Sequence, residues 1–318
     1  MMDRTTCSRL LATPALALAF IGLTASFFPG CSLKRTAVNV LGDALAGSGG
    51  VYASDDDPEL IREAIPFGLK TYEGLLAVSP GHRGLLLAAA SGFTAYAYLV
   101  QDDAERLDAT DLPRARELRA RAHKLYRRGR DYALRALEAS RPGFAARLKA
   151  DPESALSLTT KDDVPFLYWA GASWAGALTA AKDDLDLIAE LPMAGALVGR
   201  ALELDETYDL GATHEFFISY EASRPGGSAR LAREHYCRAL EISRGQRASV
   251  HLALAEALTI QEQNLAEFRA LLAAAMAVNP DEVPHLRLAN TIARRRALWL
   301  ETRIPDLFVE ANHMEETP

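Results

Sequence analysis

Residues 239–243 read Ala-Leu-Glu-Ile-Ser: an apolar pair, a variable residue, another apolar residue and a small polar residue. The same pattern occurs at 75–79, 136–140, 201–205 and 275–279. The ends of the five segments are 61, 65, 38 and 36 positions apart, so the last three lie near the roughly 34-residue period of tetratricopeptide repeats. Each such repeat is a pair of helices that stacks on its neighbours. The sequence therefore predicts an all-α fold, a tetratricopeptide-like array of helical hairpins.

Apolar residues recur every three or four positions beyond residue 50, and the alternation typical of strands is missing. Asp57-Pro58-Glu59 is typical of a helix start, because Asp57 can accept hydrogen bonds from free amides and Pro58 has no amide to leave unpaired. Pro66 predicts a kink or a later start in this helix. About ten main helices are expected, at residues 58–79, 83–108, 112–140, 165–181, 192–204, 208–223, 227–243, 247–261, 264–278 and 284–302. The three prolines of 142–165 predict a crossing loop with a short helix at 144–149.

The first 30 residues have the layout of an export signal, with Arg4 and Arg9 before an apolar run that ends at Phe28. Cleavage before Cys31 and attachment of a diacylglycerol to its thiol would tether the chain to a membrane without spanning it. Phe28 and Pro29 are unusual residues before such a cysteine, so plain secretion and an uncleaved anchor remain alternatives. We expect a lipoprotein signal peptide at 1–30, a lipid-anchored tether with a short helix and a flexible segment at 31–50, a helical domain at 51–310 and a tail at 311–318.

Composition limits the partners of this chain. The 318 residues carry a net charge of −7, which becomes −8 once a leader of net +1 is removed, and this sign argues against binding of nucleic acid. Of the three cysteines, Cys7 lies in the leader and Cys31 would carry lipid, so no internal disulfide is expected. Cys237 is predicted to be a buried small residue, with a reactive thiol as the alternative.

Residues 164–181 contain no charged side chain. They are too short and too weakly hydrophobic for a membrane span, because 18 residues cover only about 27 Å. A helix that is apolar all round is normally a buried spine of the core. Tyr168, Trp169 and Trp174 could belong to this spine alone, or could also form the wall of a ligand cavity.

Other candidate ligand-binding residues are polar groups that share a helical face with apolar residues. His214 is spaced with Leu210, Phe217 and Ile218, which predicts either a hydrogen-bonded core histidine or a group that lines a pocket. Glu215, Tyr220, Glu256 and Asn290 complete the candidate set. Metal is not expected, because His214-Glu215 has no second histidine four residues later. No enzyme template is found, so no catalytic residue and no cofactor are predicted.

Basic residues crowd the segment from Arg114 to Arg130. They predict either a solvated helix face or contact with anionic lipid headgroups or an acidic partner surface. The same alternatives apply to Arg294-Arg295-Arg296.

Several stretches together resemble the T component of tripartite ATP-independent periplasmic (TRAP) transporters. They are residues 52–60, 83–94, 166–169, 214–221, 255–258 and 263–268. The resemblance implies a periplasmic lipoprotein with degenerate tetratricopeptide repeats that associates with the substrate-binding P component. It further implies a homotrimer, and a pore or cleft through each protomer for a hydrophobic or amphipathic ligand. The outer membrane is favoured over the inner membrane as the place of the anchor.

Two other functions are kept as alternatives. One is an envelope scaffold that recruits other proteins and holds no small ligand, because helical arrays bind proteins far more often than they catalyse. The other is a hydrolase that uses His214 and Glu215 in a deep pocket.

Overall fold

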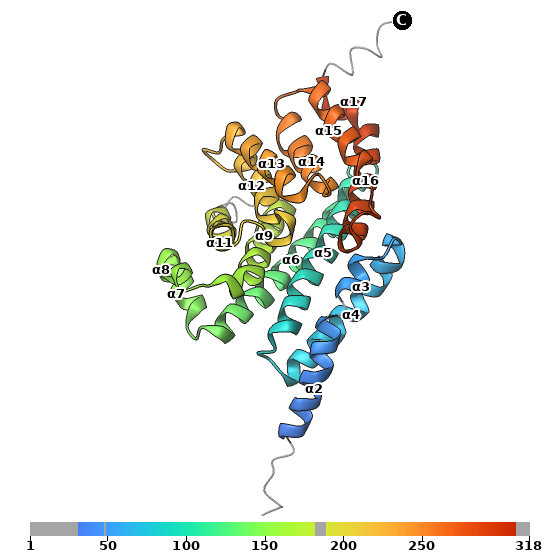
Figure 1. Ribbon diagram of the computed structural model, residues 1–318. Coiled ribbons are helices and arrows are strands. Elements are labelled where there is room, and N and C mark those ends of the chain that lie inside the picture. The colour runs from blue at the N-terminus through green and yellow to red at the C-terminus, as the bar shows by residue number, and fades with distance from the viewer. Residues whose placement is uncertain (1–30, 48, 182–188, 310–318) are drawn as a thin grey trace, which may run out of the picture.

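The computed structural model describes residues 31–47, 49–181 and 189–309, and these residues form an all-α fold without strands (Figure 1). The helices that begin the chain are α2 (Cys31–Ala46), α3 (Gly49–Ala53), α4 (Pro58–Val78), α5 (Arg83–Leu107), α6 (Leu112–Ser140), α7 (Phe144–Ala150) and α8 (Pro152–Ser157). They are followed by η2 (Lys161–Asp163), α9 (Val164–Ala180), α11 (Leu191–Leu204), η3 (Tyr208–Leu210), α12 (Ala212–Ser223) and α13 (Ala229–Ser243). The last elements are α14 (Ala248–Leu254), the π-helical η4 (Ala255–Thr259), α15 (Leu265–Ala277), η5 (Pro284–Leu286), α16 (Arg287–Thr302) and α17 (Ile304–Leu307).

The ten expected helices are all present. They correspond to α4, α5, α6, α9, α11, α12 with η3, α13, α14 with η4, α15, and α16 with η5. The Asp57 carboxylate caps α4 by accepting hydrogen bonds from the amides of Glu59 (3.1 Å) and Leu60 (3.0 Å). The later start suggested by Pro66 is wrong, because α4 begins at Pro58 and runs through Pro66 to Val78.

The expected crossing loop at 142–165 is more helical than predicted. Helix α7 confirms the short helix at 144–149, but α8 was not expected. Asp151 caps α8 by accepting a hydrogen bond from the Ser154 amide (3.1 Å), and Pro152 occupies its first position. This is the same Asp-Pro start signal as in α4, masked here by the density of prolines.

The short helix expected within 31–50 is present as α2, and it packs on the body of the protein. Asn39 of α2 accepts a hydrogen bond from the Ser79 hydroxyl (2.7 Å), and its carbonyl lies 3.2 Å from His82 Nε2. Gly42 makes a close approach possible, since a Cβ atom there would lie 2.9 Å from both His82 and Leu85. The predicted signal peptide at 1–30 and the predicted tail at 311–318 lie outside the described residues.

In the part of the chain that the structure describes, the buried apolar side chains form two hydrophobic cores. The first is formed by α4 to α9 and α11, and the second by α12 to α17 with residues up to Phe308. Among the described residues, α5 is the single helix that is long and apolar enough to cross a membrane, but half of its apolar window is buried. Leu85, Leu86 and Ala89 of α5 are fully buried in the first core, so α5 is a core helix. Helix α9 is likewise packed into this core through Leu167 and Ala170.

Candidate functional site

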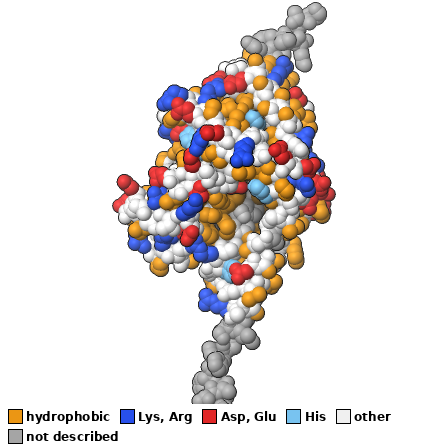
Figure 2. All heavy atoms as spheres, viewed as in Figure 1, with side chains coloured by type: hydrophobic (Ala, Val, Ile, Leu, Met, Phe, Trp, Pro, Cys, Tyr) orange, Lys and Arg blue, Asp and Glu red, His pale blue; other side chains and the backbone are white. Residues whose placement is uncertain are grey.

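The face seen in Figure 2 is hollowed near the middle of the molecule, where α5, α6 and α9 lie in Figure 1, and hydrophobic side chains form part of the wall. Tyr98 of α5 is 39% exposed, yet desolvation by burial raises the pKa of its phenol. Tyr98 lies close enough to Arg296 and Glu105 for their charges to act on its phenol.

A buried arginine lies beside Tyr98. Arg296 of α16 is 8% exposed and donates hydrogen bonds to Asp102 (2.7 Å), Glu105 (2.7 Å) and Glu256 (2.8 Å). Asp102 and Glu105 belong to α5, in the first hydrophobic core, whereas Glu256 and Arg296 belong to the second. This set of four residues, which we call the Arg296 cluster, joins the two cores through charge-assisted hydrogen bonds.

The position of Glu256 depends on a local change of helix type. Helix α14 ends at Leu254, and residues 255–259 continue as the π-helical turn η4. A π-helical turn adds a residue per turn and so rotates the side chains that follow it, and such turns are frequent at functional sites. Here the carboxylate of Glu256 reaches Arg296 of α16. The desolvation of the buried Arg296 cation is compensated, because its nitrogens donate four hydrogen bonds to carboxylates.

A second buried arginine lies next to α9. Arg247 donates hydrogen bonds from Nε to Glu215 (3.0 Å) and from Nη1 to the carbonyl (2.8 Å) and carboxylate (3.2 Å) of Asp209. Desolvation by burial raises the pKa of the nearby Tyr168 phenol, and Glu215 and Asp209 raise it further. Tyr168 also contacts Trp169 (ring centroids 5.1 Å apart). The structure thus brings together three predicted site residues: Tyr168, Trp169 and Glu215.

The predicted site residue His214 forms part of a different group. Its Nδ1 lies 2.8 Å from Nδ1 of His235, and its Nε2 lies 3.4 Å from Glu206. One ring must therefore donate to the other, which requires that at least one be neutral. Desolvation by burial lowers the pKa of both histidines, and His214 lowers that of His235 further. Glu206 in turn accepts hydrogen bonds from Arg238.

The other predicted residues hold helices in place. The Trp174 indole donates to Glu190 (2.7 Å), and Arg130 stacks on its ring. Tyr220 lies against Gly195 of α11, where a Cβ atom would come within 2.3 Å of its hydroxyl. Asn290 accepts from the Ala248 amide (3.0 Å) and donates to the Gln246 carbonyl (2.9 Å), which fixes the start of α14.

The TRAP transporter T-component family profile matches residues 54–308, almost the whole of the two-core body. The chain belongs to this family. An uncharacterized protein of Treponema pallidum (strain Nichols) is 33% identical over 309 residues, which cover 88% of this chain and 94% of that protein. The family is one of transport accessory proteins and is not a known enzyme family.

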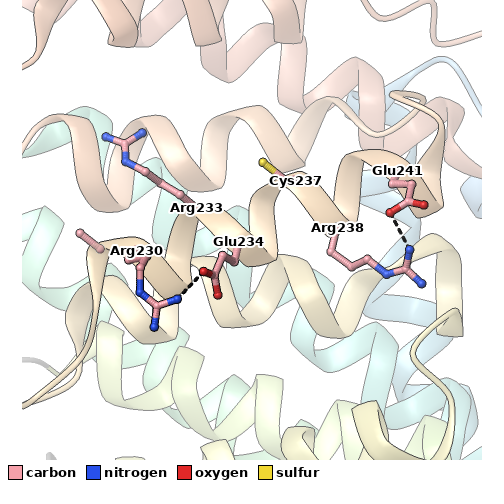
Figure 3. Close-up of a pocket in the computed structure, with 7 residues that line it drawn as sticks. Arg230, Arg233, Glu234, Cys237, Arg238 and Glu241 are labelled. Atoms are coloured by element: carbon pink, nitrogen blue, oxygen red, sulfur yellow. Dashed lines mark hydrogen bonds and ion pairs between the residues drawn. The ribbon is translucent and has the colours of Figure 1, made fainter.

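Cys237 of this T component is exposed, so the prediction of a buried cysteine is wrong. Helix α13 buries Ala232, Ala239 and Ser243, and Cys237 lies on the opposite face. An open groove of about 690 Å³ runs along α13 and includes Cys237 in its lining. Figure 3 shows the thiol between the side chains of Arg233 and Arg238. The groove is lined by Ala229, Arg230, Arg233, Glu234, Cys237, Arg238 and Glu241. Its arginines are already paired, as the Arg230–Glu234 and Arg238–Glu241 contacts show (Figure 3).

A smaller recess of about 230 Å³ lies where α4, α5 and α16 of this T component meet. It is lined by Pro58, Glu59, Arg62, Leu99, Asp102, Arg106, Ile292 and Arg295. Asp102 accepts from Arg106 (2.8 Å) on this side and from Arg296 (2.7 Å) on the other. The recess and the Arg296 cluster therefore share one carboxylate.

Helix α6 of this T component divides its basic residues into two groups. Arg119 pairs with Asp108, Arg128 with Glu73, and Arg114 with Glu117. Arg116, Lys124 and Arg127 are exposed and have no ion pair among the described residues. These three residues form an exposed basic stripe, which is compatible with a solvated helix face and with contact to anionic headgroups or an acidic partner surface.

Sequence reasoning missed Tyr98, Arg247 and Arg296. Tyr98 lies four and seven residues before Asp102 and Glu105, a spacing that places all three on one face of α5. That spacing was a usable signal. Arg296 gave none, because its partner Asp102 is 194 positions away.

Proposed function

We propose that this protein is a periplasmic accessory lipoprotein of a TRAP-type transport system. It binds the substrate-binding P component, and it holds a small hydrophobic or amphipathic organic ligand in the central hollow. The observation that carries the proposal is the T-component match across residues 54–308. The hollow with hydrophobic side chains in its wall, seen in Figure 2, supports the ligand.

Ligand contacts are assigned to the accessible members of the candidate set. Tyr168 and Trp169 are partly exposed and would offer aromatic faces, while Glu215 and Glu256 would offer polar ends. The other members of the candidate set would not contact the ligand but would hold its surroundings in place, because their polar atoms are bonded to protein or packed against it. They are Trp174, His214, Tyr220 and Asn290.

A lipid on Cys31 would fix the protein to the envelope, with the outer membrane favoured. Cys31 is the first residue of α2, which packs on α5 through Gly42 and Leu85, so the anchor would lie at a defined place on the body. Mass spectrometry of the membrane-extracted protein should find a diacylglycerol on Cys31, and Cys31→Ala should move the protein to the soluble fraction. A soluble wild-type protein without acyl mass would refute the anchor.

A homotrimer is part of the same proposal. Phe67 is 80% exposed and Leu60 is 55% exposed, and their seven-residue spacing places them on one face of α4. Burial of such a face between subunits is favourable. Light scattering of the purified protein should give three times the protomer mass, and Phe67→Glu should lower it. A monomeric wild-type protein would remove this part of the proposal.

The test of the main function is recovery of both partners. Crosslinking in native membranes followed by purification should recover a solute-binding protein, and native mass spectrometry should show a small-molecule adduct. Recovery of the P component with repeatedly empty spectra would replace the ligand carrier by the scaffold alternative. Absence of the P component under crosslinking would refute the transport role itself. Ester turnover that is lost in His214→Ala would instead support a hydrolase.

A further inference from the structure

We infer that the exposed face of α4 and the exposed basic stripe of α6 are the two halves of one subunit interface. In this interface α4 of one copy packs against α6 of the next copy. The inference rests on the homotrimer of the proposed function. It adds which two faces meet, and it assigns a second copy of this chain as the occupant of each face.

The α4 half of the interface is apolar and carries an acidic residue. Phe67 is 80% exposed and Leu60 is 55% exposed, although both are large apolar side chains. Glu63 lies on the same face, is exposed and has no ion pair among the residues that the structure describes. Two large apolar side chains exposed together on one face indicate a surface that is covered in an assembly.

The α6 half is positively charged. The exposed cations Arg116, Lys124 and Arg127 form the basic stripe, which is about 16 Å long. Ala120 is exposed in the middle of the stripe and leaves room for a large side chain. Two copies of net charge −7 repel each other overall, so a contact between them needs a locally positive surface opposite a negative one. The stripe provides that surface.

The two faces are complementary when the helices run antiparallel with Phe67 opposite Ala120. The largest exposed side chain of α4 then lies over a small residue of α6, with basic groups beside its ring. Glu63, four residues before Phe67, faces Lys124, four residues after Ala120. An exposed anion and an exposed cation, each without an ion pair in the described part of its own copy, are thereby brought together.

The same register matches a second pair of charges. Lys70 of α4 faces Glu117 of α6, and each is otherwise engaged only in an ion pair one turn along its own helix. Such surface pairs contribute little, so they can be exchanged for contacts between copies. Leu60 lies against the aliphatic stem of Arg127, which can cover apolar surface while its guanidinium stays in water. Attraction and apolar burial therefore favour one and the same register.

An interface of this kind closes into a ring. Helices α4 and α6 both pack on α5 in the first core, which fixes the two faces relative to each other. One face of a copy meets a different face of the next copy, so the contact is heterologous. A heterologous contact that repeats around a threefold axis leaves neither face uncovered.

An anionic membrane is less suited to the basic stripe. Arg135 of α6 donates to the Pro80 carbonyl (3.1 Å), next to Ser79, on which α2 docks. The stripe begins about 12 Å further along α6, and the Cys31 end of α2 points away from the body (Figure 1). The stripe would therefore lie more than the screening length of about 8 Å from a bilayer that holds the Cys31 anchor.

A charge exchange tests whether the two faces meet. Light scattering of the purified full chain over a range of concentrations gives the concentration at which half of the trimer dissociates. Glu63→Lys and Lys124→Glu each place like charges opposite each other and should raise that concentration about tenfold. The double variant restores an opposite pair and should return it to within about threefold of the wild-type value. Lys149→Glu makes the same charge change at an exposed position of α7 and should leave it unchanged.

Disulfide formation tests the register independently. Cys237→Ser first removes the exposed thiol of α13. In this background, the chain with Phe67→Cys and Ala120→Cys should form a covalent trimer when it is oxidised by glutathione disulfide, which is reduced to two glutathione molecules as each bond forms. Phe67→Cys alone should form no covalent oligomer, because these positions do not face each other in a heterologous ring. Both sites are exposed, so the fold tolerates the substitutions.

The outcomes separate the inference from the homotrimer on which it rests. A monomeric wild-type protein overturns both. A trimer that Glu63→Lys and Lys124→Glu leave intact overturns the inference and keeps the homotrimer; loss of binding to phosphatidylglycerol vesicles in Lys124→Glu would then assign the stripe to the membrane. Weakening in both variants without recovery in the double variant overturns the inference, as does equal weakening in Lys149→Glu. Covalent dimers of Phe67→Cys alone overturn it too, because two copies of α4 would then face each other.

Discussion

Replacement of Arg296 by methionine tests whether charge-assisted contacts join the two cores. The substitution keeps most of the apolar stem and removes the guanidinium that three carboxylates share. Removal of one partner of a buried ion pair costs roughly 3–5 kcal/mol, because the remaining charges stay uncompensated. Glu105 and Glu256 are partly exposed and can rehydrate, so we expect the lower end, about 3 kcal/mol.

The neighbouring arginine is a matched control. Arg295 pairs with Glu59 at an exposed site, where an ion pair contributes about 0–1 kcal/mol. Urea unfolding followed by circular dichroism should therefore separate the free energies of unfolding of Arg296→Met and Arg295→Met by about 2 kcal/mol or more. Addition of Glu256→Gln to Arg296→Met should restore part of the loss, because one uncompensated carboxylate is removed.

A difference below about 0.5 kcal/mol between the two single variants would refute this reasoning. It would mean that water already compensates the carboxylates of the Arg296 cluster. The two cores would then be held together by apolar contacts alone.

Three further predictions follow from other contacts. Burial lowers the pKa of His214 and His235 below the ordinary 6.5, so below that pH the unfolded state binds more protons than the folded state. The free energy of unfolding should therefore be highest above pH 6.5 and should fall as the pH is lowered towards 5. An equal urea midpoint at pH 5 and pH 7.5 would contradict this. Gly176→Ala should lower the free energy of unfolding by about 1–3 kcal/mol, because the added methyl group would clash with the Tyr126 ring. Gly74→Ala, in open space on α4, should raise it by about 0.5–1 kcal/mol. Thermal melts of the two variants measure both effects. Asn290→Ala should lower the free energy of unfolding in urea by about 1–3 kcal/mol, because the Ala248 amide and the Gln246 carbonyl lose their partner. A loss below about 0.5 kcal/mol would mean that water replaces the Asn290 side chain at both groups.

Helix positions were predictable because their signals are local. The Asp57-Pro58 cap and the three-to-four residue apolar spacing act within one or two turns of chain, and the same signal at Asp151-Pro152 would have revealed α8. The orientation of a helix about its axis was harder to predict. Cys237 lies in a helical segment and has no partner cysteine, which favoured burial, but α13 buries the face that carries Ala232 and Ala239.

The polar clusters could not be predicted because they join distant parts of the chain. In the sequence, Arg296 is one of three consecutive arginines. Its burial depends on the contacts that α16 makes with Asp102 and Glu105 of α5. Glu256 was identified as a polar intrusion, but its partner depends on the π-helical turn η4, and such turns have no strong sequence signal. Tyr168, Trp169 and Glu215 were predicted individually, and the fold brings them to one place through η3 and α12.

The docking of α2 on α5 also determines how the body would stand on a lipid bilayer. A 16-residue helix is about 24 Å long, and Asn39 and Gly42 hold it against His82. For a chain acylated at Cys31, this rod would set both the height of the body above the headgroups and the direction in which its hollow opens. Every copy in the envelope would then hold its hollow at the same height and tilt, so a partner that diffuses in the plane would have to search only the rotation about the membrane normal.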